Sequence, residues 1–199
     1  MFWSSPAFFS FAVSREFEQD MKGTRIDEFL GDTAAREREQ FHRQVMESGQ
    51  VRSHIQITAD RRVMCTTYPL DEQAFGHKGV FAVLVDAPST LPEGMESEIP
   101  VLSSPHLDLL SALSNRELEV LHYIAQGLST GDIASELTRS SKTVEKQINS
   151  IHSKLDTHSR AELVRFATER GIQAFTKDEW SKIVEGAKTT RRELSKSAD

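Results

Sequence analysis

The stretch SSKTVEKQINSIHSKL, from Ser140 to Leu155, determines how the second half of this chain folds. Its apolar residues recur every three or four positions, which is the spacing of one face of an α-helix. Most of the other residues in the stretch are polar and fall on the opposite face. The apolar face consists of Val144, Ile148, Ile151 and Leu155, and the polar face of Lys142, Glu145, Lys146, Asn149 and Ser153. The pattern predicts an amphipathic helix that is buried on one side and exposed on the other.

The sequence on both sides of this helix carries the start signals of further short helices. Ser114 and Glu117 have the spacing of a capping box, in which each side chain bonds the backbone N–H of the other residue. Ser159 and Glu162 repeat that spacing. Together with the apolar periodicity, these signals predict four short helices within residues 113–172. Two short helices joined by a tight turn and followed by a longer one form a helix-turn-helix.

The polar face of the third helix has the chemistry to contact DNA. Lysine can bond phosphate or guanine, and asparagine can pair with adenine in the major groove. A helix of this length spans roughly 24 Å at ~1.5 Å per residue and fits a groove ~12 Å wide. The same residues could also form a solvated helix face. Taken alone, the face is better explained as solvated, and it is the family resemblance described next that favours contact with double-stranded DNA.

Residues 113–172 resemble the LuxR-type helix-turn-helix domain. The matching stretches are LSNRELEVL (113–121), AQGLST (125–130), DIASEL (132–137), SSKTVEKQINSIHSKL (140–155) and SRAELV (159–164). The resemblance implies an all-α, four-helix DNA-binding domain. It also implies a homodimer, formed through the fourth helix, that binds inverted half-sites.

The resemblance carries DNA-contacting roles to nine positions. Base contacts are expected from Glu145, Lys146 and Asn149. Phosphate contacts are expected from Lys142, Thr143, Gln147 and Lys154, and from Ser129 or Thr130 at the start of the second helix, where free backbone N–H groups favour an anion.

Four residues depart from the family's pattern. Glu145 stands where the family commonly has Lys, and Gln147 where it often has His. These two changes leave the preferred DNA sequence open, since a glutamate repels phosphate but can accept a hydrogen bond from cytosine. Arg139 replaces an aliphatic residue and Asp156 a glycine, which leaves the local packing and the turn geometry open.

The first half of the chain has a mixed pattern. Residues 33–48 predict a helix that ends at Gly49. Three runs rich in Val, Ile, Thr and aromatic residues follow at 51–58, 62–68 and 79–86, and they predict consecutive antiparallel strands. Another apolar run, 7–13, predicts an earlier strand. A helix followed by such strands is an α+β arrangement.

This first half resembles a PAS domain over residues 7–87. The likeness lies in GTRIDEFL (23–30), in a helix closing on Glu47-Ser48-Gly49, in two strands joined by a short turn, and in YPL (68–70) before a last strand ending at Asp86. The resemblance implies an antiparallel sheet with helices. It also implies a domain that senses a small-molecule or protein signal, or that mediates dimerisation.

A proline-rich segment separates the two halves, since four of the six prolines fall between Pro88 and Pro105. Proline disfavours helix and sheet, so we interpret residues 88–111 as a linker. The expected organisation is a PAS-like domain (1–87), the linker (88–111), the LuxR-type domain (112–175) and a helical extension with a tail (176–199). The extension has a small apolar face formed by Trp180, Ile183, Val184 and Ala187, which predicts a fifth helix.

Composition and charge limit the classes of function. The net charge is −6, and residues 1–105 account for it with 10 Lys and Arg against 16 Asp and Glu. The single cysteine, Cys65, excludes an internal disulfide framework and a multi-cysteine zinc site. We find no catalytic set of side chains, and we predict no enzyme activity, no cofactor and no metal site. No apolar run reaches the ~18 residues of a membrane span, so no membrane partner is expected and the expected location is the cytoplasm.

Two functions follow from these observations. The first is a sequence-specific transcription regulator whose PAS-like domain senses a signal or mediates dimerisation. The alternative is a protein-interaction module whose helix-turn-helix no longer binds DNA, which the acidic net charge and Glu145 favour. An affinity for DNA that falls with salt distinguishes the two, because phosphate neutralisation releases counterions.

Overall fold

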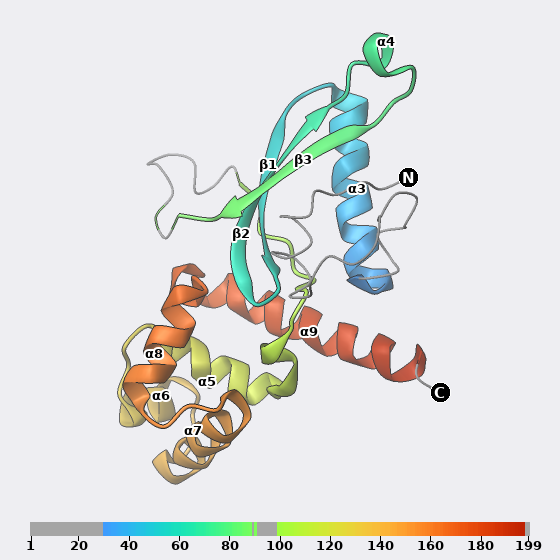
Figure 1. The fold of residues 1–199 in the computed structure, drawn as a ribbon. Coiled ribbons are helices and arrows are strands. Elements are labelled where there is room, and N and C mark those ends of the chain that lie inside the picture. The colour runs from blue at the N-terminus through green and yellow to red at the C-terminus, as the bar shows by residue number, and fades with distance from the viewer. Residues whose placement is uncertain (1–29, 89, 91–98, 198–199) are drawn as a thin grey trace.

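The computed structural model of the chain describes residues 30–88, 90 and 99–197. Its first part is a three-stranded antiparallel sheet with a long helix, and its second part is helical (Figure 1). The order of elements confirms the helix and the three strands that the sequence predicts for residues 33–86. The strand predicted at 7–13 lies outside the described residues.

The sheet consists of three consecutive strands in the order β1, β2, β3. They are β1 (Arg52–Thr58), β2 (Arg61–Pro69) and β3 (Val80–Asp86), and the short helix α4 (Glu72–Phe75) lies between the last two. Ala59 and Asp60 form the tight turn between β1 and β2, with φ of 46° and 65°. In the antiparallel register His54 lies opposite Cys65. Cys65 is buried, as expected for a small residue in a strand.

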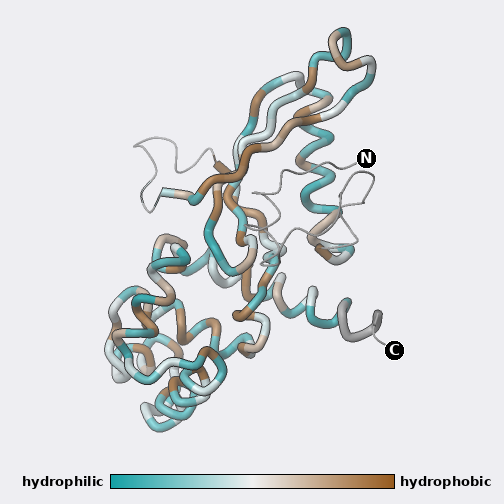
Figure 2. Tube along the Cα trace, in the orientation of Figure 1, coloured by the Kyte–Doolittle hydropathy of each residue, from teal (hydrophilic) through white to brown (hydrophobic). Residues whose placement is uncertain are grey.

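Helix α3 (Asp32–Ser48) covers one face of this sheet (Figure 1). The ring of Phe41 contacts the ring of His54 edge to face, with 4.3 Å between centroids. The helix ends at Gly49, whose φ of 66° is the left-handed conformation that glycine adopts without strain. No described element covers the opposite face of the sheet along β3, where Figure 2 shows hydrophobic residues and where Phe81 and Val85 are exposed.

Part of the proline-rich segment lies along the free edge of β1. The backbone N–H of Ile55 donates to the carbonyl of Pro100, and that of Leu102 donates to the carbonyl of Ile55. Farther on, the N–H of His106 donates to Ile57. Proline has no N–H to donate, but its carbonyl still accepts a strand-type bond. This part of the predicted linker is therefore bonded to the sheet, while the domain boundaries themselves stay a prediction.

The second part contains the four short helices that the sequence predicts. They are α5 (Asn115–Ala125), α6 (Thr130–Glu136), α7 (Ser141–Leu155) and α8 (Arg160–Glu169), preceded by the 3₁₀ turn η1 (Leu109–Ala112) and followed by η2 (Ile172–Ala174). The capping box of Ser114 and Glu117 is present. At α8 the prediction was wrong in one respect. Ser159 caps the helix, but the carboxylate of Glu162 accepts from the N–H of His158 rather than from that of Ser159.

Helix α9 (Lys177–Ser197) confirms the predicted fifth helix. Its apolar face is buried, and the indole N–H of Trp180 donates to the carbonyl of Leu118 at 2.9 Å. Gly186 lies so close to the proline-rich segment that a Cβ atom there would stand 1.9 Å from the carbonyl oxygen of Ser103. Toward its end α9 reaches α3, where the carboxylate of Glu193 accepts from the backbone N–H of Thr33. Helix α9 therefore contacts both parts of the molecule (Figure 1).

Candidate nucleic-acid interface

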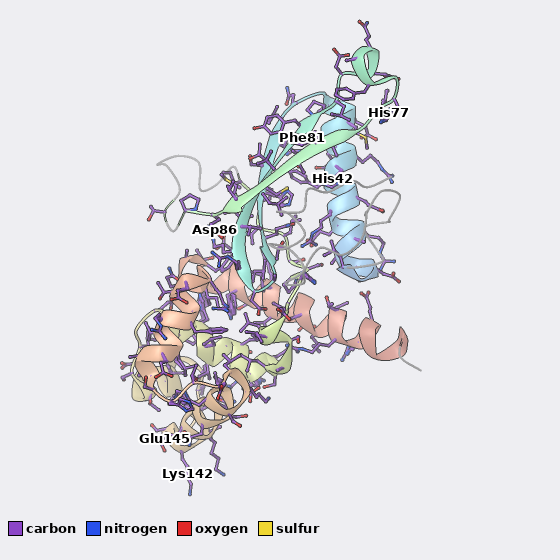
Figure 3. All side chains as sticks on the ribbon, viewed as in Figure 1. His42, His77, Phe81, Asp86, Lys142 and Glu145 are labelled. Atoms are coloured by element: carbon purple, nitrogen blue, oxygen red, sulfur yellow. The ribbon has the colours of Figure 1, made fainter. Side chains whose placement is uncertain are left out.

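Helix α7 has the two faces that its sequence predicts. Val144, Ile148, Ile151 and Leu155 are buried. The hydroxyl of Ser140 caps the start of the helix by accepting the N–H of Thr143 at 3.2 Å. Figure 3 shows Lys142 and Glu145 at the end of the molecule farthest from the sheet. No other described element covers that face, on which Lys142, Thr143, Glu145, Lys146 and Asn149 are all exposed.

The end of α7 accommodates the aspartate that replaces the family's glycine. Asp156 has a φ of 50° and a ψ of 50°, in the left-handed region. Aspartate tolerates this conformation better than most residues with a side chain. Its backbone N–H still donates to the carbonyl of His152, so the helix ends in the usual way.

Helix α6 packs against α7 and begins at two of the predicted phosphate-contacting residues. Ser129 caps α6 with a full capping box, because its hydroxyl accepts from the N–H of Asp132 and the aspartate accepts from the N–H of Ser129. This reciprocal cap uses the Ser129 hydroxyl, one of the two groups at this helix start that the family resemblance implies as phosphate contacts. Thr130 follows at the first position of the helix and is half-buried.

Lys154 differs from the other predicted contacts because an ion pair orients it. Its ammonium Nζ lies 2.7 Å from Oε2 of Glu117, which is almost fully buried at the start of α5. Burial alone raises the pKa of Glu117, but hydrogen bonds from Lys154, Ser150 and Ser114 outweigh it and lower that pKa to about 2. Glu117 is therefore ionised near neutral pH, and its ion pair connects α7 to α5.

Gln147 also has a hydrogen-bond partner within the domain, Arg139, whose role the sequence did not reveal. Arg139 donates from Nη1 to Oε1 of Gln147 at 3.4 Å and from Nη2 to the carboxylate of Glu119 at 3.0 Å. Its side chain is mostly buried between the helices. The sequence did show that Arg139 is unusual, because the family has an aliphatic residue at this position. Its partner on α5 is twenty residues away, so spacing along one helix could not indicate it.

The predicted site residues therefore divide into two groups. Five share the open face of α7, and that face carries the charges of Lys142, Lys146 and Glu145. The other four, Ser129, Thr130, Gln147 and Lys154, lie at helix ends or take part in contacts between helices.

Across 30–88, 90 and 99–197, no group of three His, Cys, Asp or Glu side chains is placed to bind a metal ion. No helix within the same residues is long and apolar enough to cross a membrane.

Comparison with known proteins agrees with this geometry. Residues 111–167 match the model of the family described as bacterial regulatory proteins, luxR family. The nitrate/nitrite response regulator protein NarP of Escherichia coli (strain K12) is 46% identical over 67 residues, which are 33% of this chain and 31% of NarP. The Fimbriae Z protein of the same strain is 41% identical over 64 residues, 32% of this chain and 30% of its own length. The chain thus spans about a third of the length of these curated relatives.

Solved structures of the VqmA protein of Vibrio cholerae are also similar. One, a dimer without target DNA, is 24% identical and covers 75% of this chain and 69% of its own, with a TM-score of 0.35. The family match rests on the helical part alone: residues 111–167 form a helix-turn-helix domain that belongs to the luxR family of bacterial regulatory proteins.

Proposed function

We propose that this chain is a sequence-specific transcription regulator that binds double-stranded DNA through α7. The observation that carries the proposal is the open polar face of that helix. Lys146 and Asn149 lie on it where they could reach base edges, and Lys142 and Thr143 lie near its start, where phosphates would pass. The buried face of α7 packs against α5 and α6, which would keep its orientation fixed in the groove.

The regulator would act as a homodimer. A single helix contacts only a few base pairs, whereas two copies spaced by one helical turn, ~34 Å, would contact both halves of an inverted repeat. The exposed apolar residues of β3, among them Phe81, Val83 and Val85, offer one surface for pairing. The fourth helix of the domain, α8, offers another. Sedimentation equilibrium of the full chain tests the stoichiometry.

The first part of the chain would sense a signal and change the position of the helical part. Support for this coupling comes from the turn between β1 and β2. The carboxylate of Asp60 accepts from the backbone N–H groups of Asp108 and Leu110, at 2.8 and 3.1 Å, where the helical part begins. The N–H of Arg62 donates to the carbonyl of Arg170 after α8, at 2.8 Å. A change in β1 would therefore reach the DNA-binding domain through direct bonds.

A selection of genomic fragments with the full-length chain tests the proposal. Fragments retained at moderate salt are sequenced, and an inverted repeat is the expected result. The matched control is a double variant, Lys146→Ala with Asn149→Ala, which removes two exposed side chains and leaves the buried face of α7 intact. The same fragments retained by both proteins, or no enrichment by the wild type, would contradict base contact through α7.

One observation favours the alternative of a protein-interaction module. Glu145 is exposed in the middle of the open face, where it would repel phosphates. The salt dependence of binding separates the two functions. The DNA affinity of a regulator falls as the salt concentration rises, because binding releases counterions from the phosphates, whereas an interaction module shows no such dependence.

A further inference from the structure

A group of polar side chains is buried between α3 and the sheet. Arg38 of α3 is 4% exposed, and His54 of β1 is 1% exposed. Gln56 and Thr67 are buried on the same face of the sheet, and so is the thiol of Cys65. Burial of a charged or polar group is costly unless a partner compensates for the water it loses. The hydrogen-bond partners of these buried groups therefore show which of their polar atoms remain uncompensated.

Arg38 is only partly compensated. Its Nη1 donates to the carbonyl oxygens of Ala34 and Ser104, at 3.0 and 3.2 Å. Its Nη2 is buried and has no hydrogen-bond partner in the part of the chain that the structure describes. The adjacent carboxylate of Glu37 is occupied elsewhere, since it accepts from the backbone N–H groups of Ser103 and Ser104, both at 2.9 Å.

His54 has one unpartnered ring nitrogen as well. Its Nε2 lies 3.1 Å from Oε1 of Gln56, and Nε2 of Gln56 donates onward to Thr58 at 2.9 Å. This arrangement assigns the histidine proton to Nε2 and leaves Nδ1 as an acceptor. That Nδ1 is buried and without a partner among the described residues. Burial lowers the pKa of His54 to about 4, so the ring is neutral near neutral pH and Nδ1 keeps its lone pair.

The two unpartnered nitrogens lie in the same layer between α3 and the sheet, since Phe41, one turn along α3 from Arg38, contacts the ring of His54. Burial is the largest influence on the neighbouring groups: it lowers the pKa of His54 and raises that of Cys65, while the charge of Arg38 acts to lower both pKa values. His54 and Cys65 lie directly opposite each other in the β1–β2 register. The ring of Phe41, one turn along α3, forms an apolar wall against His54. The site therefore presents one charged donor and one neutral acceptor beside an aromatic ring.

We propose that this cluster binds a small organic carboxylate that also bears an O–H or N–H group, with the carboxylate on Nη2 of Arg38 and the donor on Nδ1 of His54. Guanidinium groups pair with carboxylates through strong, charge-assisted bonds, and such a ligand would satisfy both buried nitrogens at once. The proposal rests on the sensing role proposed above and names its ligand class.

The same hydrogen bonds connect the ligand site to the DNA-binding part. From His54 the side chains bond in sequence to Gln56 and Thr58, which ends β1. The next turn contains Asp60, whose carboxylate bonds the backbone at the start of the helical part. A ligand on His54 would therefore act on the strand that leads to this junction.

Isothermal titration of the full chain tests the proposal with two hydroxycarboxylates, L-lactate and 4-hydroxybenzoate. Their uncharged amides, lactamide and 4-hydroxybenzamide, serve as matched probes of the same shape. Saturable binding of at least one carboxylate, at least about tenfold tighter than its amide, is the expected result. Arg38→Met should abolish that difference, while Arg43→Met, an exposed position on the same helix, should keep it.

Equal binding of acids and amides, equal binding to Arg38→Met, or no binding at millimolar concentration would overturn the proposal. The comparison of acid with amide on the wild-type chain needs no variant, so a folding defect in Arg38→Met cannot decide the test. DNA affinity is measured on the same preparations. If the wild-type chain binds DNA but binds the carboxylates no more tightly than their amides, only this inference is overturned. If it binds a carboxylate more tightly than the amide but does not bind DNA, only the proposed function is overturned.

Discussion

Single side chains decide how α7 is fixed to the rest of its domain, and Glu117 is the clearest case. Its carboxylate bonds the ammonium of Lys154 and the backbone N–H of Ser114 at the same time. Glu117→Gln keeps the shape but removes the charge, so it should lower the free energy of unfolding by about 1–2 kcal/mol at neutral pH. Urea unfolding measures this loss. Glu145→Gln is the control, because Glu145 is exposed on the open face of α7 and the same change of charge there should leave the stability unchanged.

The effect of Glu117 should also depend on pH. Its pKa in the folded chain, about 2, lies below the ordinary value of 4.5. The carboxylate therefore stabilises the fold above about pH 4.5, and that contribution is lost as the pH falls toward 2. The difference between wild type and Glu117→Gln should shrink over this range. A difference that stays constant down to about pH 3 would contradict the assignment of the ion pair.

Lys142 tests the phosphate contacts of the open face. It is exposed at the start of α7, so Lys142→Ala should leave the fold unchanged. The variant should weaken binding to all DNA sequences alike and reduce the slope of log affinity against log salt by about 1. Fluorescence anisotropy at several salt concentrations measures the slope. Lys188→Ala, on α9, is the control with an equal change in charge, and a slope reduced equally by both variants would refute the contact.

The sequence predicted the open face of α7 correctly but not the bonds of its neighbours. The exposed positions follow from helical periodicity, which depends only on spacing within one element. The partners of Lys154 and Arg139 lie on α5, and nothing in the local pattern of either residue specifies a partner so far along the chain. The buried cluster around Arg38 was also missed, because a charged residue in an amphipathic helix is ordinarily assigned to the exposed face.

At the scale of elements, contact between α9 and the proline-rich segment depends on one glycine. Gly186→Ala would bring a Cβ to 1.9 Å from the carbonyl of Ser103, so backbone must move. We expect a loss of roughly 1–3 kcal/mol in the free energy of unfolding. Gly131→Ala in α6 is the control, because its Cβ would meet nothing closer than 3.8 Å and alanine favours a helix by about 1 kcal/mol.

Chemical denaturation of both variants measures these opposite effects. Equal stability of Gly186→Ala and the wild type would show that α9 does not pack on this segment as described. The sequence predicted α9 and its apolar face but not this contact. Proline-rich composition indicates only that a segment avoids helix and interior strand, and it does not exclude a bond to a free strand edge.

For the whole molecule, buried histidines should make stability sensitive to mild acid. Burial lowers the pKa values of His42, His54 and His122, and that of His54 reaches about 4 from an ordinary 6.5. Arg38 and His42 lower the pKa of His54 further, while Gln56 and Glu37 act in the opposite direction. Since the unfolded chain binds the proton more readily, stability should fall as the pH drops from 6.5 toward 4.

Denaturant midpoints measured between neutral pH and about pH 4.5 test this dependence. His54→Gln should make the loss of stability with falling pH shallower. His77→Gln is the control, because His77 is exposed beyond α4 (Figure 3), and it should leave the slope unchanged. Identical slopes in the wild type and His54→Gln would contradict the neutral, buried ring.

Contact between the open face of α7 and the bases of DNA is tested by comparing base preference in the wild type and in Lys146→Ala. The enriched DNA site competes against versions with single base changes at every position, in fluorescence anisotropy at one salt concentration. Lys146→Ala should lose about 1–3 kcal/mol of discrimination at one base pair in each half-site and keep its preference elsewhere. A Lys146→Ala protein that keeps the full preference at every position would contradict base contact through the open face of α7.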